Sequence, residues 1–482
     1  MIKLKEFIKK YQSLNVVIKA SLWFSICSFF QKGVSIIMMP IFTRLLSTSE
    51  YGKYSIYVSW YQIFTIFITL NIHKEIFNKG LIEHNKEQDE YTVNQMGLMI
   101  ILCFSFLVLY IACHKIINSI TGLSILLSGF LIIEVFSNGI ISLWTSRKRF
   151  SYEYKKISIV TVLLSLLNPI IGIILVKICN SKVEARVLST IIVPVILSII
   201  LLYIYSKKGK FFSNYKYWLN SIYKSIPLLP HYLSLVLLNQ SDKLMINYFY
   251  DSTATAIYSV AHTAGLLMVI VNESLNNSFV PWAYNKLKNN RIVELKKMIR
   301  PLLYIVLFAN ILLIWIAPEC VYLMAAPEYS NAIWSIVPIA VSVYCTFIYT
   351  LFVDIEIYYE GNVFVTIGSI IAACINVLLN YLLIPKIGYI AAAYTTLISY
   401  FTTMIIHYIF MVHILKKKNI EQNIFNEREI MFVFLLLIIF SALALITYNY
   451  FFVRYLFVFV LLIIIYFKRN TINQVLSQVK RK

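Results

Sequence analysis

The segments that connect the apolar stretches of this chain alternate in charge. Residues 146–156 hold five Lys or Arg side chains, whereas the preceding connection, 114–121, holds only Lys115. Positively charged loops of membrane proteins stay on the cytoplasmic side. The alternation therefore predicts a chain that crosses a bilayer many times, and it indicates which side each loop faces.

The composition agrees with a membrane protein. The 482 residues are 60% hydrophobic and only 13% charged, whereas soluble domains carry about 25% charged residues. The net charge is +21, but the basic residues flank apolar spans and form no single patch, which argues against a nucleic-acid binder. Seven cysteines without a Cys-x-x-Cys pair predict neither a disulfide framework nor a zinc site.

A bilayer core about 30 Å thick requires roughly 20 apolar residues per helix. By this measure the sequence predicts an all-α polytopic membrane protein with about 14 transmembrane helices. The expected spans are 16–40, 52–73, 92–113, 121–145, 157–177, 187–206, 222–249, 253–281, 301–317, 331–354, 363–384, 388–413, 430–448 and 451–467.

The distribution of basic residues predicts that both termini are cytoplasmic. With the N-terminus assigned to the cytoplasm, 32 of the 43 Lys and Arg residues fall in inside loops. One inside turn, 354–362, breaks the pattern, because it has three acids and no base. The outside loops hold seven basic residues: Arg44, Lys115, Lys177, Lys182, Arg186, Lys386 and Arg454.

The loops differ in length as well as charge. The outside loops have at most about a dozen residues, so no large outside domain is expected. The inside segments 207–224 and 285–300 are basic and predict short interfacial helices.

A weak internal repeat aligns Tyr54-Ser55 with Tyr258-Ser259, 204 residues later. Six predicted helices separate the two positions. An even number keeps both copies in one orientation, so the halves would be parallel repeats. So short a match is also compatible with chance.

Motifs for enzymatic chemistry are missing from the sequence. It contains no P-loop, no Gly-x-Ser-x-Gly elbow and no His-Glu-x-x-His motif. No catalytic residue, metal ligand or cofactor site is therefore expected.

Polar residues inside the spans are the remaining candidates for function, because ionisable groups in hydrocarbon are costly. In the first span, serines and Lys32 recur every three or four residues and share a helix face: Ser21, Ser25, Ser28, Lys32 and Ser35. The stripe is compatible with a polar lumen, and equally with close helix packing in which Lys32 pairs with an acid.

Other spans carry further ionisable groups: Glu134, Asp242, Lys243, His262 and Glu273. Lys32 and Lys243 would attract an anion, whereas Asp242, Glu273 or Glu134 would bind a coupling cation or proton. The alternative is that these groups form internal ion pairs that only fix helix packing. Tyrosines at 54, 57 and 61 lie near one face, where they suit either sugar stacking or ordinary packing.

The segment from Pro40 to Tyr54, with Thr43, Arg44 and Gly52, resembles the loop after the first helix of bacterial polysaccharide flippases. These are the Wzx-type O-antigen transporters of the multidrug/oligosaccharidyl-lipid/polysaccharide exporter superfamily. The segment with Asp242 and Lys243 and the start of the following span resemble the family again, and length and helix count agree along the whole chain.

The resemblance implies two six-helix lobes, 1–206 and 207–413, around a central cavity, and two extra helices with a basic tail in 414–482. It implies transport of undecaprenyl-diphosphate-linked oligosaccharide across the bacterial cytoplasmic (inner) membrane for O-antigen or capsular polysaccharide, by alternating access with a proton or sodium ion. Possible partners are a polysaccharide polymerase and a chain-length regulator. A multidrug or organic-cation antiporter of the same superfamily is the alternative, and a membrane polysaccharide polymerase is a weaker one.

Overall fold

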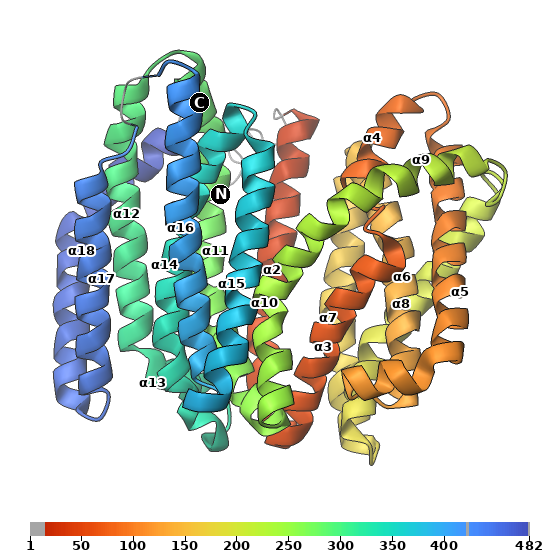
Figure 1. Ribbon diagram of the computed structural model, residues 1–482, viewed down its shortest axis with the longest axis horizontal. Helices are drawn as coiled ribbons and strands as arrows, with labels where there is room; N and C mark the ends of the chain where they lie inside the picture. The colour runs from red at the N-terminus through yellow and green to blue at the C-terminus, as the bar shows by residue number, and fades with distance from the viewer. Residues whose placement is uncertain (1–14, 421–423, 481–482) are drawn as a thin grey trace, which may run out of the picture. The chain divides into compact units, whose positions relative to one another are not determined.

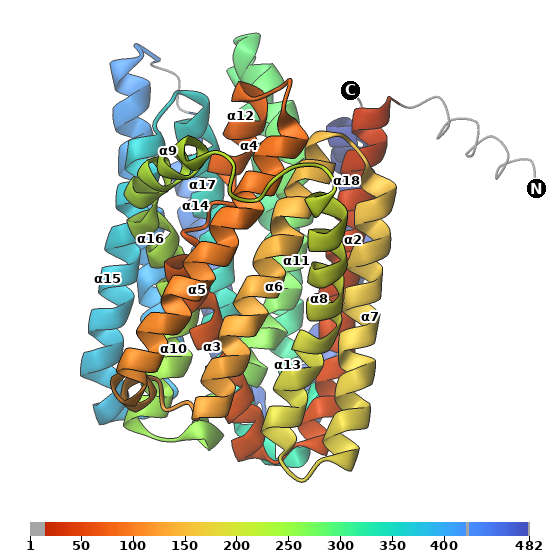
Figure 2. The ribbon, with the colours of Figure 1, turned by 90° about the vertical axis from the view of Figure 1, so that its right-hand side faces the viewer.

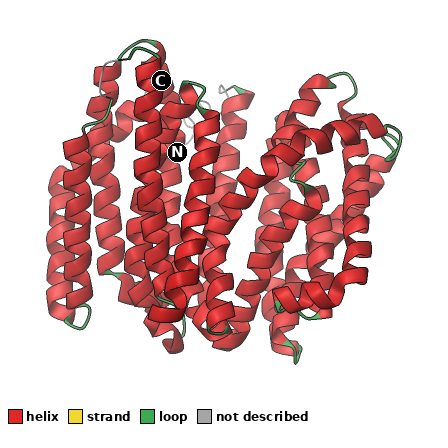
Figure 3. Cartoon of the chain, viewed as in Figure 1, coloured by secondary structure: helices red, strands yellow, loops and turns green. Residues whose placement is uncertain are grey.

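The computed structural model describes residues 15–420 and 424–480 (Figure 1). Throughout these ranges the regular elements are helices joined by short loops, and no strand occurs in them (Figure 3). Eleven helices of the described chain are long and apolar enough to cross a membrane. The prediction of an all-α polytopic membrane protein is confirmed.

The chain divides into two compact units, Met1–Leu233 and Ser234–Lys482. The helices that begin in the first unit are α2 (Val16–Leu45), α3 (Thr48–Thr69), α4 (Glu75–Glu83), α5 (Gln88–Thr121), α6 (Ile125–Phe150), α7 (Tyr154–Ile178), α8 (Lys182–Ser206), α9 (Tyr215–Ser225) and the 3₁₀ turn η1 (Ile226–Leu228). α10 (Leu229–Phe249) leads into the second unit, which continues with α11 (Ser252–Lys288), α12 (Ile292–Trp315), α13 (Ala317–Met324), η2 (Pro327–Ala332), α14 (Ile333–Tyr358), α15 (Asn362–Ile387), α16 (Ala391–Lys417), α17 (Glu427–Thr447) and α18 (Phe451–Lys480).

Most predicted spans overlap one long helix, and many helices run further into the polar flanks. The span expected at 222–249 is instead divided among the end of α9, η1 and α10. One expectation is wrong: 285–300 is no separate interfacial helix, because α11 continues to Lys288 and α12 begins at Ile292. Lys286 of α11 pairs with Glu294 of α12 across the turn, so this basic stretch extends two long helices. The other interfacial segment does contain a helix, α9, and the sequence analysis missed α4 and α13.

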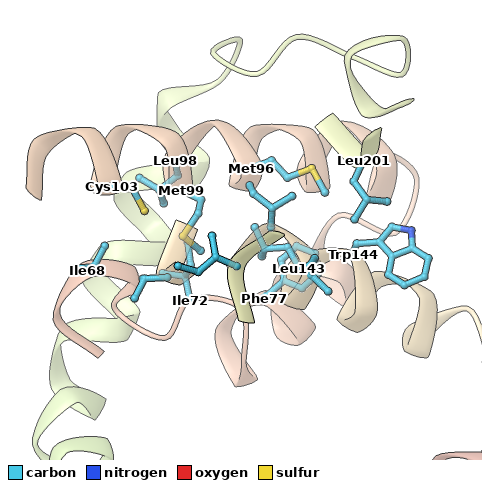
Figure 4. Packing of buried hydrophobic residues seen from close by; sticks show 14 of the residues in the cluster. Ile68, Ile72, Phe77, Met96, Leu98, Met99, Cys103, Leu143, Trp144 and Leu201 are labelled. Carbon is cyan, nitrogen blue, oxygen red and sulfur yellow. The ribbon is translucent and has the colours of Figure 1, made fainter. Parts of the chain in front are cut away.

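The core of the first unit lies where α4, α5, α6 and α8 meet. Figure 4 shows Met96 and Met99 of α5 among Phe77 of α4 and Leu143 of α6, all members of one buried cluster. Figure 2 shows α6, α7 and α8 side by side, and α8 contacts both of its neighbours. Unbranched methionines fill such irregular gaps between helices.

α9 is fastened to α4 and α5, against which it lies (Figure 1). The indole Nε1 of Trp218 donates to the carbonyl of Asn94 at 2.8 Å, and Nδ2 of Asn94 donates to Ser213 at 3.0 Å. Lys224 pairs with Glu83 of α4 at 3.1 Å. The segment that follows α8 is therefore part of the first unit.

In the second unit α14 is the central helix, and it packs against α11, α12, α15, α16 and α17. α17 and α18 pack against α12, and polar contacts hold their connection and the start of α18 to the ends of α12 and α13. Tyr448 donates to the carbonyl of Ile314 at 2.8 Å, and Arg454 binds Glu319 through two nitrogens at 2.7 and 2.9 Å.

Large apolar side chains cover the outward faces of several helices. On α5, for example, Ile111, Ile116 and Ile120 are 64%, 63% and 68% exposed. A soluble protein rarely exposes so much contiguous apolar surface, and hydrocarbon is the solvent that suits it.

The helix boundaries repeat with the spacing found in the sequence. α2 ends at Leu45 and α10 at Phe249, and after two residues α3 begins at Thr48 and α11 at Ser252. All of these positions are 204 residues apart, as are the first residues of α5 and α12. The boundaries of the two lobes and of the C-terminal helices themselves stay predictions.

Candidate substrate and ion sites

The first unit holds a buried carboxylate between α3 and α6. The hydroxyl of Tyr57 donates to Oε2 of Glu134 at 2.6 Å, and Glu134 is 8% exposed. One turn further along both helices, Nδ2 of Asn138 donates to the hydroxyl of Tyr61 at 3.0 Å. The partners are four residues apart on each helix, so both pairs lie on facing stripes.

Arg186 of α8 brings a cation to the same region. Its guanidinium carbon lies 4.0 Å from the ring centroid of Phe42 and 4.6 Å from that of Tyr54. Nη1 donates to Oγ of Ser189 at 2.9 Å, and the group interacts electrostatically with Glu134. The sequence analysis placed Arg186 in an outside loop because it began this helix at 187, whereas α8 begins at Lys182.

Gly172 of α7 makes this close arrangement possible. A Cβ at this position would lie 2.8 Å from Oγ of Ser189, 3.0 Å from Cζ of Phe42 and 3.3 Å from Nη1 of Arg186. Side chains of α2 and α8 meet the backbone of α7 here at a distance that only glycine allows.

The residues of the family motif build the corner between α2 and α3. Arg44 donates to the carbonyl of Pro40 at 2.9 Å, and Thr43 donates to that of Met39 at 3.0 Å. Gly52 is buried in the first turns of α3. These contacts indicate a role in shaping the corner, and a direct role in binding is untested.

The first turn of α3 is closed by a reciprocal cap. Oγ of Ser47 accepts from the backbone N–H of Glu50, and the Glu50 carboxylate accepts from that of Ser47. This capping box satisfies two backbone N–H groups that the helix itself leaves unpaired. Lys182 of α8 donates to the carbonyl of Leu45 at 3.3 Å, which ties the corner to α8.

Lys32 lies half-buried on α2, and the serines of its stripe are exposed or half-buried within the first unit. Packing of the helices therefore leaves the side chains of this stripe at least partly exposed. Whether it lines a passage for substrate stays a prediction.

The second unit contains a larger polar network, centred on Asp242 of α10. Oδ1 of Asp242 accepts from Nδ2 of Asn380 at 2.6 Å, and Oδ2 accepts from Oγ1 of Thr396 at 2.6 Å and from the Tyr258 hydroxyl. Asn376 donates to Thr396 at 3.2 Å. These residues are at most 6% exposed and come from α10, α11, α15 and α16.

The other predicted residues of this unit lie around the network. Lys243 is half-buried and donates to Oε1 of Gln240 at 3.2 Å. His262 is half-buried beside Tyr258, with ring centroids 6.4 Å apart, and interacts electrostatically with Lys243. Glu273 is exposed on α11, three turns from His262.

The atoms of this network that could bind an ion are oxygens. A carboxylate stands among amide and hydroxyl oxygens, which are the ligands that hard cations prefer, and the carboxylate alone can take a proton. Across the described residues no group of three or more His, Cys, Asp or Glu side chains could hold a metal ion.

Sequence reasoning missed Asn376, Asn380, Thr395 and Thr396. The signal was present: the two asparagines are four residues apart in a span that is otherwise apolar, and buried amides require partners. α3 and α10 give a second signal, since neither is among the eleven helices apolar enough to count as spans. These two helices carry Tyr57 and Asp242.

Comparison with known proteins identifies the family of this chain. Residues 17–285 match the family described as "Polysaccharide biosynthesis protein". The Lsg locus protein 1 of Haemophilus influenzae is 23% identical over 372 residues, which are 75% of this chain and 90% of that protein.

Solved structures show the fold. The lipid II flippase MurJ in an inward closed conformation superimposes with a TM-score of 0.68, at 14% identity, over 94% of this chain and 100% of that one. An inward-facing multidrug resistance MATE transporter of the MOP superfamily gives 0.64 at 13% identity, over 84% and 100%. With its family match spanning more than half of its length, the chain belongs to the polysaccharide biosynthesis protein family and has the fold of the MurJ and MATE transporters.

Proposed function

We propose that this protein moves undecaprenyl-diphosphate-linked oligosaccharide units from the cytoplasmic to the outer leaflet of the bacterial cytoplasmic membrane. The flipped units would supply O-antigen or capsular polysaccharide synthesis. Family membership together with the MurJ-like fold is the observation that carries this proposal.

The physical chemistry of the substrate supports the proposal. A diphosphate with several sugars cannot cross hydrocarbon unaided, because each unpaired polar group costs several kcal/mol, about 2–7 by transfer data. The polyprenyl tail needs no such help. The polar side chains of α3 and α10 and the Lys32 stripe of α2 support the proposal, because the head group requires polar contacts on its way.

Lys32, Lys243 and Arg186 are the proposed contacts for the diphosphate. The half-buried Tyr54 and Tyr61 of α3 are the proposed contacts for sugar rings, whereas Tyr57 is buried. Guanidinium and ammonium groups bind phosphate oxygens through charge-assisted hydrogen bonds. Glu134 interacts electrostatically with Arg186, and His262 with Lys243. We propose that these two groups, together with Glu273, tune the charge that the head group meets.

We further propose that the Asp242 network binds the coupling ion, a proton or sodium, because no ATP motif is present in the sequence. Binding of radioactive sodium to purified protein separates the two ions. Saturable sodium binding that is lost in Asp242→Asn supports sodium as the coupling ion. Absence of sodium binding to the wild type at neutral pH supports the proton.

Deletion of the gene, followed by leaflet-specific detection of the lipid-linked sugar, tests the main proposal. A membrane-impermeant sugar-oxidising reagent is applied to right-side-out and to inverted vesicles. We expect the units to be labelled only in inverted vesicles of the deletion strain, and in both kinds after complementation.

The same experiment distinguishes the alternatives. For a polymerase, single units would accumulate on the outer leaflet of the deletion strain. For a multidrug antiporter, the lipid-linked sugar would be unchanged, and export of organic cations from loaded cells would fall. Either result would overturn the flippase proposal.

A further inference from the structure

The inside turn that breaks the charge pattern contains a buried acid–base pair. Glu356 lies in the last turn of α14 and is 0% exposed. Both of its carboxylate oxygens lie 3.1 Å from Nδ1 of His407 of α16, which is 2% exposed. The turn has no basic residue of its own, and the base of the pair, His407, comes from α16.

Neighbouring side chains enclose the pair. A Cβ on Gly368 of α15 would lie 2.6 Å from Nε2 of His407, so α15 approaches the imidazole as closely as glycine permits. Tyr349 stacks on the His407 ring with centroids 5.6 Å apart and planes at 22°. Tyr400 stacks in turn on Tyr349 at 6.2 Å and interacts electrostatically with Asp242.

Several other ionisable groups at this end interact with residues outside the pair. Asp354 of α14 points to α11, where it interacts with Asn276 and Tyr284. The remaining pairs join neighbouring helices: Tyr408 of α16 with Glu427 of α17, and Arg300 of α12 with Glu429 of α17. α15 faces the imidazole with Gly368.

The net charge of the buried pair determines how many protons it can hold. With one shared proton it is neutral overall, either as carboxylate and imidazolium or as carboxylic acid and imidazole, and the observed geometry satisfies both forms. Loss of that proton leaves a net negative charge in a dry site, and gain of a second leaves a net positive charge. Both are costly at such burial.

We propose that Glu356 and His407 form a proton-binding site of the second unit, separate from the Asp242 network. The site holds one proton while α14 and α16 are packed together and releases it to water when these helices separate at this end. The use of that proton in transport rests on the proposed function, whereas its binding does not.

Hydrogen exchange of the full-length protein in nanodiscs tests the binding. Residues 349–358 are followed from pH 5 to 9 in wild type and Glu356→Gln, with correction for the intrinsic pH dependence of exchange. A water-exposed histidine loses its proton near pH 6.5, so above about that pH the open state holds one proton fewer than the packed state. In that range raising the pH favours opening by up to about tenfold per pH unit, whereas below it little dependence is expected. The glutamine variant keeps a hydrogen-bonding partner but no acid, so above about pH 6.5 its opening should vary less with pH than that of wild type.

His413→Gln serves as the matched control, because His413 lies six residues further along α16 and is exposed. It should retain the wild-type dependence. A pH-independent wild type, or equal slopes in wild type and Glu356→Gln, would overturn the proposed site. If Glu356→Gln fails to accumulate, the double variant Glu356→Gln, His407→Asn, which has no titratable group left in the pair, provides the same comparison.

Translocation of lipid-linked sugar in proteoliposomes, measured across the same pH range, tests the use of the proton. We expect the pH profile of wild type to flatten in Glu356→Gln. Identical profiles would overturn a role in transport, whatever the exchange result. Failure of wild type to translocate at any pH would instead refute the proposed function, and the exchange measurement would still decide the proton site.

Discussion

Tyr57 of α3 donates a 2.6 Å hydrogen bond to Glu134 of α6, and the tyrosine is itself only 1% exposed. An acceptor of this kind, removed from water, depends on its donor: an unsatisfied buried partner costs about 1–3 kcal/mol, and more when it is charged. Loss of this bond would therefore destabilise the first unit, and it would affect Glu134, the carboxylate proposed to tune the charge that the head group meets.

Tyr57→Phe should therefore destabilise the protein by about 1–3 kcal/mol. The thermal midpoint of the purified protein in detergent would fall. Tyr61→Phe is the matched control, because its hydroxyl accepts from the neutral amide of Asn138, and it should cost less. Equal midpoints for wild type and Tyr57→Phe would contradict the importance of the bond.

Gly172→Ala should destabilise the first unit, since the added methyl would meet Ser189, Phe42 and Arg186 at 2.8–3.3 Å. Overpacking of this kind costs about 1–3 kcal/mol. Gly129→Ala is the control: it also lies inside a helix but has no atom within 4 Å of the new methyl group. It should be neutral or stabilising by up to about 1 kcal/mol. Thermal midpoints that fail to separate the two variants would count against the packing described.

Asp242→Asn should abolish surface polysaccharide while the protein remains in the membrane, because the amide retains the size but not the charge of the carboxylate. Asn239→Ala, on the same helix, is the control. Asn239 is exposed and donates to its own helix backbone at 2.8 Å, so no loss is expected. Immunoblots of membranes and of surface polysaccharide provide the two readings. Normal polysaccharide in Asp242→Asn removes this residue from the candidate ion site.

Lys32→Ala should lower surface polysaccharide if this lysine contacts the diphosphate. Lys115→Ala, which removes an exposed lysine from α5, should have no effect. Comparable loss in both variants would point to a general effect of positive charge, and no loss in either would exclude Lys32 from the binding residues.

The attachment of α9 to α4 should weaken in acid. The hydrogen bond from Lys224 holds the pKa of Glu83 below its usual value of 4.5. A carboxyl group with a lowered pKa stabilises the attached state above its usual pKa and loses this contribution as the pH falls through the lowered value. After correction for the intrinsic pH dependence of exchange, protection of residues 215–225 should thus decrease at pH below about 4, modestly because the pair is exposed. Glu83→Gln should lose this pH dependence.

The sequence predicted the spans well because hydropathy is a local property. The lengths of the helices were harder to predict from the sequence. Polar residues such as Asn285 continue a helix beyond its apolar run, and α11 therefore reaches Lys288. Arg186 was misplaced for the same reason, since its helix begins five residues before the apolar run that marked it.

Pairings between helices were not predictable from one sequence. Asp242 was recognised as a candidate, but its partners Asn380 and Thr396 lie 138 and 154 residues away. The turn with Glu356 looked like an exception to the charge pattern, and only folding brings His407 to it. Such contacts depend on which faces of helices meet, and hydropathy does not determine that.

The common spacing of helices in the two units has a consequence for how the polar clusters arose. Tyr54 and Tyr258 occupy corresponding positions, yet the first stacks on the cation of Arg186 and the second binds the carboxylate of Asp242. If one ancestral hairpin was duplicated, its tyrosine was inherited twice and afterwards acquired partners of opposite sign. One half would then use the ring face of the inherited tyrosine toward a cation, and the other half its hydroxyl toward a carboxylate.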